Sequence, residues 1–172
     1  MKVDSRAPCE ADLPIVATPS VWTEARPLLH PTEAPLLQWS SPHPMSWADL
    51  RSGVAGDLRR NELLDLLEDR LARLRRQRIE ACFVLLGGGF ARPGHIPSDL
   101  DALVGYRLTD DVGSEQLAGA LLDKSIPELD LRFVPVDAKP ALLVRVACFF
   151  HTLYQSRDLA SSQASLLIEL ES

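Results

Sequence analysis

Residues 85–106 read LLGGGFARPGHIPSDLDALVGY, and this stretch decides the fold. An apolar run ends in three glycines, a polar loop follows, and two aspartates one residue apart open the next apolar run. Side chains alternate faces along a strand, so Asp99 and Asp101 are expected on the same face while Leu100 points into the core. The pattern predicts two strands joined by a loop, with two carboxylates at the head of the second strand.

The composition suits a globular protein with one core, because the 172 residues are 46% hydrophobic and 24% charged. The formal net charge of −6 argues against general binding to nucleic acid or anionic membrane. Residues 59–78 contain seven arginines, but residues 57–80 also contain six acids, so a solvated helix face is expected there.

The cysteines and the apolar runs bear on the compartment. Cys9, Cys82 and Cys148 lie far apart and form no zinc-binding spacing, so we expect reduced thiols. No run approaches the ~20 apolar residues that span a bilayer, and the N-terminus lacks the apolar core of a signal peptide. These features predict a cytoplasmic protein.

Residues 1–45 contain eight of the thirteen prolines and show no helical period, which predicts an extended or partly disordered arm. Trp22 and Trp39 lie inside this arm, although disordered segments are poor in aromatic residues. We therefore expect the arm to dock, either on its own domain or on a partner.

From residue 46 onward the chain alternates helical and strand patterns. Leucines at 3-4-3 spacing predict a long helix over residues 57–78. Further strands are expected at 81–86, 99–106 and 129–136, further helices at 114–124 and 140–155, and a last strand near the C-terminus. This order predicts a mixed α/β (α+β) domain over residues 46–172, with a small sheet flanked by helices.

The glycines and the two aspartates together suit one kind of ligand. Carboxylates two residues apart on a strand lie roughly 6–7 Å apart and can share one or two divalent cations. Without a cation they would repel each other. The glycines before them let a ligand approach the backbone and offer N–H groups to an anion such as a phosphate chain. A metal-bound nucleotide requires both the glycine turn, for its phosphates, and the carboxylates, for its metal ion.

Asp130 supplies a third carboxylate on another expected strand. If that strand lies beside the Asp99 strand, three acids converge at one edge of the sheet. Such a constellation serves phosphoryl or nucleotidyl transfer: Asp99 and Asp101 hold Mg²⁺ on the triphosphate, and Asp130 completes the second metal site and helps to deprotonate the acceptor hydroxyl. The alternative for Asp130 is an ion pair, with Arg132 two residues along as its partner.

The same stretch resembles a known signature. A hydrophobic residue, Gly-Gly or Gly-Ser, a gap of about ten residues and two aspartates alternating with hydrophobic residues mark the polymerase-beta-like nucleotidyltransferase superfamily. GGGFARPGHIPSDLDALV is similar to the minimal bacterial nucleotidyltransferases, which have Gly-Ser-Phe-Ala-Arg, a loop and Ser-Asp-hydrophobic-Asp. The motif resemblance covers residues 85–106 and 128–134, and a looser likeness extends over 46–170.

The resemblance implies a nucleotidyltransferase-like fold and a Mg²⁺-dependent enzyme that binds ATP or another NTP. Such an enzyme moves NMP, with AMP the first candidate, to a hydroxyl of a protein, an RNA or a small molecule. The resemblance places Gly88 and Gly89 on the phosphate-binding glycine–serine pair, with Gly87 and Gly88 as the alternative register, and the three aspartates on the metal ligands. Glycine in place of the usual serine removes the side-chain hydroxyl that would contact the terminal phosphate.

Two further interpretations stay open beside the enzyme. One is a catalytically weakened nucleotidyltransferase fold that binds a protein partner, such as an antitoxin-like or regulatory subunit. The missing serine and the arm favour it, whereas the three acids favour the enzyme. The other is a loop over residues 87–101 that leads into an ordinary strand. The enzyme, with an NTP as substrate and Mg²⁺ as cofactor, is the preferred expectation.

Overall fold

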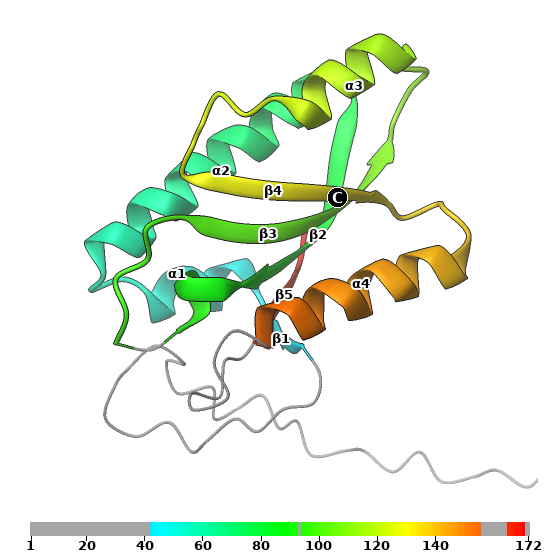
Figure 1. The fold of residues 1–172 in the computed structure, drawn as a ribbon. Helices are drawn as coiled ribbons and strands as arrows, with labels where there is room; N and C mark the ends of the chain where they lie inside the picture. Colours follow the sequence, from blue (N-terminus) through cyan, green and yellow to red (C-terminus); the bar gives the residue numbers. More distant parts are fainter. Residues whose placement is uncertain (1–41, 93, 156–164, 171–172) are drawn as a thin grey trace, which may run out of the picture.

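A five-stranded mixed sheet with helices on both faces forms the centre of the molecule (Figure 1). The computed structural model describes residues 42–92, 94–155 and 165–170. The strands are β1 (His43–Met45), β2 (Ile79–Gly87), β3 (Leu100–Leu108), β4 (Leu129–Pro135) and β5 (Leu166–Glu169). The helices are α1 (Trp47–Gly53), α2 (Leu58–Arg76), α3 (Ser114–Leu122) and α4 (Pro140–Gln155), and Gly88–Ala91 form a 3₁₀ turn, η2. The expected mixed α/β class is confirmed.

The strand order is β1-β5-β2-β3-β4. β2 pairs antiparallel with both β3 and β5, whereas β3 pairs parallel with β4 and β1 pairs parallel with β5. Two parallel strands need a crossover connection, and α3 supplies it between β3 and β4. This topology places the strand that ends in the glycines directly beside the strand that begins at the aspartates.

The period of two along β3 divides the sheet into two packed faces. Leu100 and Val104 belong to the core that α2 covers, together with the buried leucines of the expected helical stripe. Leu103 belongs to a second core, which Tyr154 and other side chains of α4 cover. The odd-numbered positions of β3, and with them Asp101, therefore face the α4 side of the sheet.

The predicted end of the arm at residue 45 is wrong, because residues 43–45 form strand β1 inside the sheet. The His43 N–H donates to the Ser165 carbonyl at 2.8 Å. The many prolines of residues 1–45 argued against a strand, but β1 is an edge strand, where the missing N–H of Pro44 need not break the ladder. The rest of the predicted arm, residues 1–41, lies outside the described residues.

Two of the three cysteines lie in the described part of the chain, and both are free thiols, as predicted. Cys82 is half-buried in β2, and burial raises the pKa of its thiol. Cys148 is exposed on α4, and Cys9 lies outside the described residues. Among the described helices, none combines the length and the apolar character that a membrane crossing requires.

Candidate functional site

The candidate site lies where β2 ends and where β3 and β4 begin. Gly87, the last residue of β2, pairs with Asp101 of β3, and Asp101 pairs with Asp130 of β4. Directly opposed residues on neighbouring strands have side chains on the same face of the sheet, with the strands about 4.8 Å apart. The register therefore brings a glycine and two of the predicted acids into one row across three strands.

Asp99 lies just before β3 and is half-buried, like Asp101, while Leu100 between them is fully buried. This alternation agrees with the prediction that both aspartates lie on one face. The Asp99 carboxylate accepts a hydrogen bond from the Ser98 hydroxyl at 2.7 Å. Asp99 thus lies at the end of the loop, and Asp101 lies in the row of residues that crosses the strands.

The turn after β2 requires glycine at its first position. Gly88 has a φ of +62°, in the left-handed region that favours glycine. A Cβ built on Gly88 would lie 2.1 Å from Oδ2 of Asp101. The Asp101 carboxylate therefore lies directly against the backbone of the glycine turn, in the space that any side chain at position 88 would occupy.

The second glycine of the turn is also closely approached. A Cβ on Gly89 would lie 3.1 Å from Cδ2 and 3.2 Å from Nε2 of His95. The imidazole of His95, an exposed loop residue, thus lies beside the turn. A ligand bound at Gly89 would meet this imidazole.

The structure does not bring the three carboxylates into one metal-binding group. In the described residues, no cluster of three or more His, Cys, Asp and Glu side chains is arranged to hold a metal ion. The predicted convergence holds for the backbone positions, but the Asp130 carboxylate turns to Arg132, and these side chains are 43% and 46% exposed at 3.1 Å. The ion pair considered as the alternative for Asp130 is therefore present. A pair this exposed contributes only about 0–1 kcal/mol and can be exchanged for a ligand.

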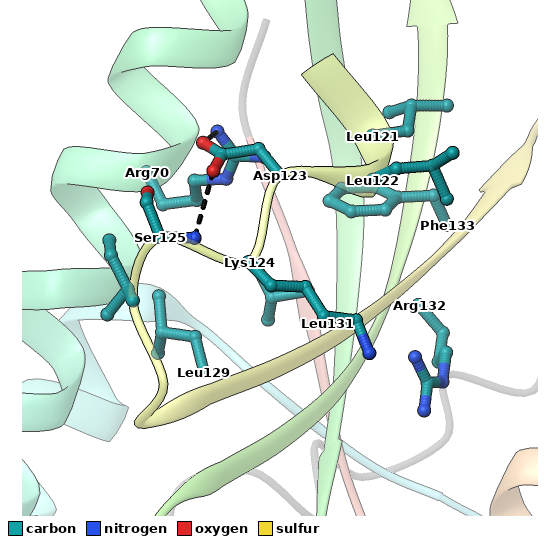
Figure 2. Close-up of a pocket in the computed structure, with 11 residues that line it drawn as sticks. Arg70, Leu121, Leu122, Asp123, Lys124, Ser125, Leu129, Leu131, Arg132 and Phe133 are labelled. Carbon is teal, nitrogen blue, oxygen red and sulfur yellow. Dashed lines mark hydrogen bonds and ion pairs between the residues drawn. The ribbon is translucent and has the colours of Figure 1, made fainter. Parts of the chain in front are cut away.

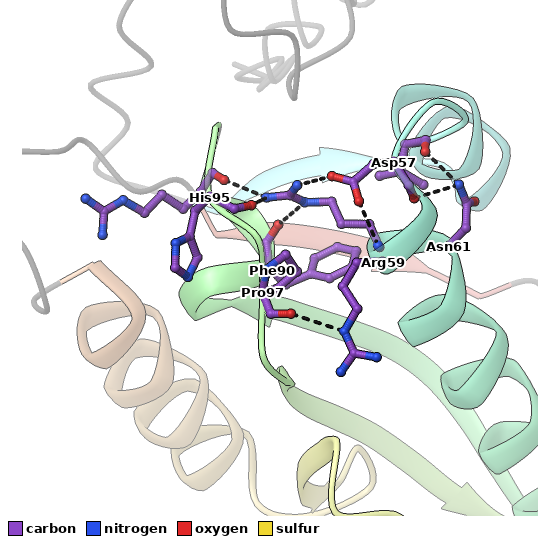
Figure 3. A network of polar contacts seen from close by, with 9 residues as sticks. Asp57, Arg59, Asn61, Phe90, His95 and Pro97 are labelled. Carbon is purple, nitrogen blue, oxygen red and sulfur yellow. Dashed lines mark hydrogen bonds and ion pairs between the residues drawn. The ribbon is translucent and has the colours of Figure 1, made fainter.

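A network of polar contacts from α2 holds the loop between the glycines and the aspartates (Figure 3). Arg60 of α2 is only 4% exposed, and Nε donates to the Phe90 carbonyl at 2.8 Å. Nη2 donates to the carbonyls of Arg92 at 2.6 Å and His95 at 2.8 Å, and Nη1 pairs with Asp57. One guanidinium thus binds three carbonyl oxygens along the loop.

The neighbouring arginine fixes the far end of the same loop. Arg59 donates from Nε to the Pro97 carbonyl at 3.2 Å and from Nη2 to the Ser98 carbonyl at 2.6 Å. Ser98 immediately precedes Asp99, so the first turn of α2 sets where the pair of aspartates begins. These two arginines contradict the expectation of a solvated helix face for the whole arginine-rich stretch.

Asp57 is the N-cap of α2, and it accepts from the Arg60 backbone N–H at 3.0 Å. Burial raises the pKa of Asp57, but hydrogen bonds and the positive charge of Arg60 outweigh it and hold this pKa below its ordinary value. The carboxylate is therefore charged near neutral pH and balances the buried guanidinium.

A separate hollow of about 250 Å³ lies beside β4 on the other face of the sheet (Figure 2). Its floor includes Leu129 and Leu131, which alternate with Asp130 and so point away from the row of acids. At its wall, Arg70 pairs with Asp123 at 2.9 Å. The hollow thus lies on the other face of the sheet from Asp130, although Arg132, the ion-pair partner of Asp130, also lines it.

A protein-family model matches residues 21–164 of the chain. The chain belongs to the DUF6932 family. DUF6932 is a family of unknown function, and no curated protein and no solved structure gives a significant match. For this DUF6932 chain, functional inference therefore rests on the residues of the site itself.

The contact between Gly88 and Asp101 predicts how much stability is lost when a side chain is added at position 88 of this DUF6932 protein. Gly94 also has a positive φ, +69°, but a Cβ there meets nothing within 4 Å. We expect Gly94→Ala to lower the free energy of unfolding by about 1 kcal/mol through its backbone conformation alone. Gly88→Ala should cost about 2–3 kcal/mol, because it must also displace the Asp101 carboxylate. Urea unfolding of the two variants measures the difference, and equal losses would show that the carboxylate is not held against the turn.

Proposed function

We propose that this protein is a Mg²⁺-dependent nucleotidyltransferase that moves NMP, with AMP from ATP as the first candidate, to a hydroxyl of a protein, RNA or small-molecule acceptor. The observation that carries the proposal is the position of Asp101. Its carboxylate lies against the glycine turn at Gly88 and in register with Asp130. A glycine turn and a pair of acids in one place suit a metal-bound triphosphate.

The residues present fit this ligand. Gly89 is half-buried, so a phosphate can reach its backbone N–H, whereas Gly88 is buried against the Asp101 carboxylate. Asp99 and Asp101 offer the carboxylate oxygens that Mg²⁺ prefers, and Asp130 can join them only by leaving its ion pair with Arg132. These residues would hold Mg²⁺, which neutralises charge on the triphosphate. The imidazole of His95 would lie near the phosphate chain.

The reaction requires few groups from the protein. The acceptor oxygen attacks the α-phosphorus, the bond from that phosphorus to the oxygen bridging the β-phosphate breaks, and pyrophosphate leaves. Asp130 takes the proton of the acceptor hydroxyl, since its side chain is 43% exposed and open to an acceptor. Arg59 and Arg60 keep the turn and Asp99 in place before the ligand arrives, which reduces the cost of ordering them.

The Asp130–Arg132 ion pair favours a second function. An acid that stays paired with an arginine is a poor metal ligand and is poorly placed to take a proton, because the guanidinium occupies its oxygen atoms and repels a cation. In that case the domain binds a nucleotide or a protein partner without catalysis, as an antitoxin-like or regulatory subunit would. The glycine in place of the serine of the superfamily agrees with this function.

A thermal-shift screen of NTPs with and without Mg²⁺, followed by a pyrophosphate-release assay, separates the two functions. Under the proposal, Mg²⁺ and NTP together raise the melting temperature, with about 2.7 kcal/mol of stabilisation when the ligand is at 100 times its Kd. Pyrophosphate release with a hydroxyl acceptor then supports the enzyme, and a shift without release supports the binding module. No shift at millimolar Mg²⁺ and NTP would contradict the enzyme and favour a module that binds a protein partner.

A further inference from the structure

Strand β4 forms an edge of the sheet, and in the described part of the chain no strand pairs with its outer side (Figure 1). The even-numbered residues face β3: the Glu128 carbonyl accepts from the first residue of β3 at 2.8 Å, and the Val136 N–H donates to a carbonyl of β3 at 2.8 Å. Backbone groups alternate between the two sides of a strand, and the register between β3 and β4 is continuous. The N–H and C=O groups of Leu131 and Phe133 therefore point outward from the edge.

A second copy of β4 can pair antiparallel with this edge only in a register that sets outward-facing residues opposite one another. Of the registers centred on the middle of the strand, one centred on Asp130 brings two carboxylates together, and one centred on Arg132 brings two guanidinium groups together. Like charges directly opposite one another are destabilising. A register centred on Leu131 instead sets Asp130 opposite Arg132 of the second copy, and twofold symmetry repeats this pair. The sequence Asp-Leu-Arg is thus complementary to itself in that register.

The same register brings apolar side chains together on the opposite face of the strand. Leu129, Leu131 and Phe133 line the hollow of about 250 Å³ beside β4 (Figure 2). Leu131 and Phe133 are only half-buried in the single chain, and Leu122, which also lines the hollow, is 74% exposed. Pairing places Phe133 of the second copy opposite Leu129 and so removes part of this apolar surface from water.

We propose that two copies of this chain pair antiparallel through β4, about a twofold axis at Leu131, and join their two five-stranded sheets into one. The ion pair between Asp130 and Arg132 within one chain is exposed, so it can be exchanged for the same contact between the copies. Arg132 of the second copy then lies at Asp130 and becomes part of the candidate site. The pairing does not depend on the proposed catalytic function.

Sedimentation equilibrium of the full chain tests the pairing by charge. The native protein should form a dimer as its concentration rises. Asp130→Arg alone and Arg132→Asp alone should each raise the dimer Kd by about tenfold or more, because both ion pairs between the copies become repulsive. An equimolar mixture of the two variants should dimerise as the native protein does, since every opposing pair is again of opposite charge. The proposal is overturned if the native protein stays monomeric, if both variants dimerise as tightly as it does, or if the variants, folded by circular dichroism, fail to dimerise on mixing.

Amide hydrogen exchange of the native protein gives a second test that needs no variant. The N–H groups of Leu131 and Phe133 should exchange more slowly as the protein concentration rises, because pairing protects them. The N–H of Arg132 faces β3 and should stay protected at every concentration, which makes it the internal control. Exchange of Leu131 and Phe133 at one rate throughout would contradict the pairing. Protection that is already complete in the monomer would also contradict it, because another segment of the same chain then covers the edge.

Discussion

Arg60→Ala is expected to lower the free energy of unfolding by about 3 kcal/mol, because removing one member of a buried charged network leaves its partners unsatisfied. The carbonyls of Phe90, Arg92 and His95 lose their donor, and the Asp57 carboxylate loses its cation. The loop that carries the glycine turn would then be free to move. Urea unfolding measures the loss, and Mg²⁺–NTP affinity should fall in the same variant even under conditions where it remains folded.

Arg59→Ala is the matched control, because it removes the same side chain from the adjacent position of the same helix. Arg59 also binds two loop carbonyls, but its side chain is 32% exposed, so water can replace it. Its removal should cost about 1 kcal/mol or less. Equal losses for the two variants would contradict the special role of the buried arginine.

Asp99→Asn combined with Asp101→Asn is expected to abolish stabilisation by Mg²⁺ and NTP and with it any nucleotidyl transfer. Amides lack the charge that holds Mg²⁺. The ligand-dependent stabilisation of about 2.7 kcal/mol, expected when the ligand is at 100 times its Kd, should therefore disappear. Without ligand, the variant should be as stable as the native protein or slightly more stable, because repulsion between two nearby carboxylates is removed. Melting curves with and without ligand measure both effects.

Asp110→Asn with Asp111→Asn gives the matched control for charge. These two exposed aspartates follow β3, and their replacement changes the net charge by the same amount. This control should keep the full ligand-dependent shift. If instead the Asp99/Asp101 variant unfolds without ligand, its carboxylates are structural and the site has no catalytic role.

Local patterns predicted most of the elements. The leucine stripe located α2, and the alternation around Leu100 placed Asp99 and Asp101 on one face, since both follow from the periods of a helix and a strand. The register that sets Asp101 opposite Asp130 depends on which strands are neighbours, and that is a property of the whole chain. The ion pair of Asp130 likewise depends on side-chain geometry that no spacing determines.

The arginines of α2 were missed because charge in a helix normally means exposure. One signal was present, since Arg60 lies four residues before Leu64 and thus on the stripe that faces the core. An arginine at a core position needs several acceptors, and the loop carbonyls supply them. Strand β1 was missed for a different reason, because the proline density of residues 1–45 suggested an arm, although an edge strand tolerates a proline such as Pro44.

A crystal structure of the protein with Mn²⁺ and a non-hydrolysable NTP analogue tests the proposed site most directly. The anomalous scattering of Mn²⁺ locates the metal independently of the protein. The proposal predicts a metal peak between the carboxylates of Asp99 and Asp101, with the phosphates on the backbone of the glycine turn at Gly89. Nucleotide bound instead in the hollow beside Arg70, or a metal peak away from both aspartates, would contradict it.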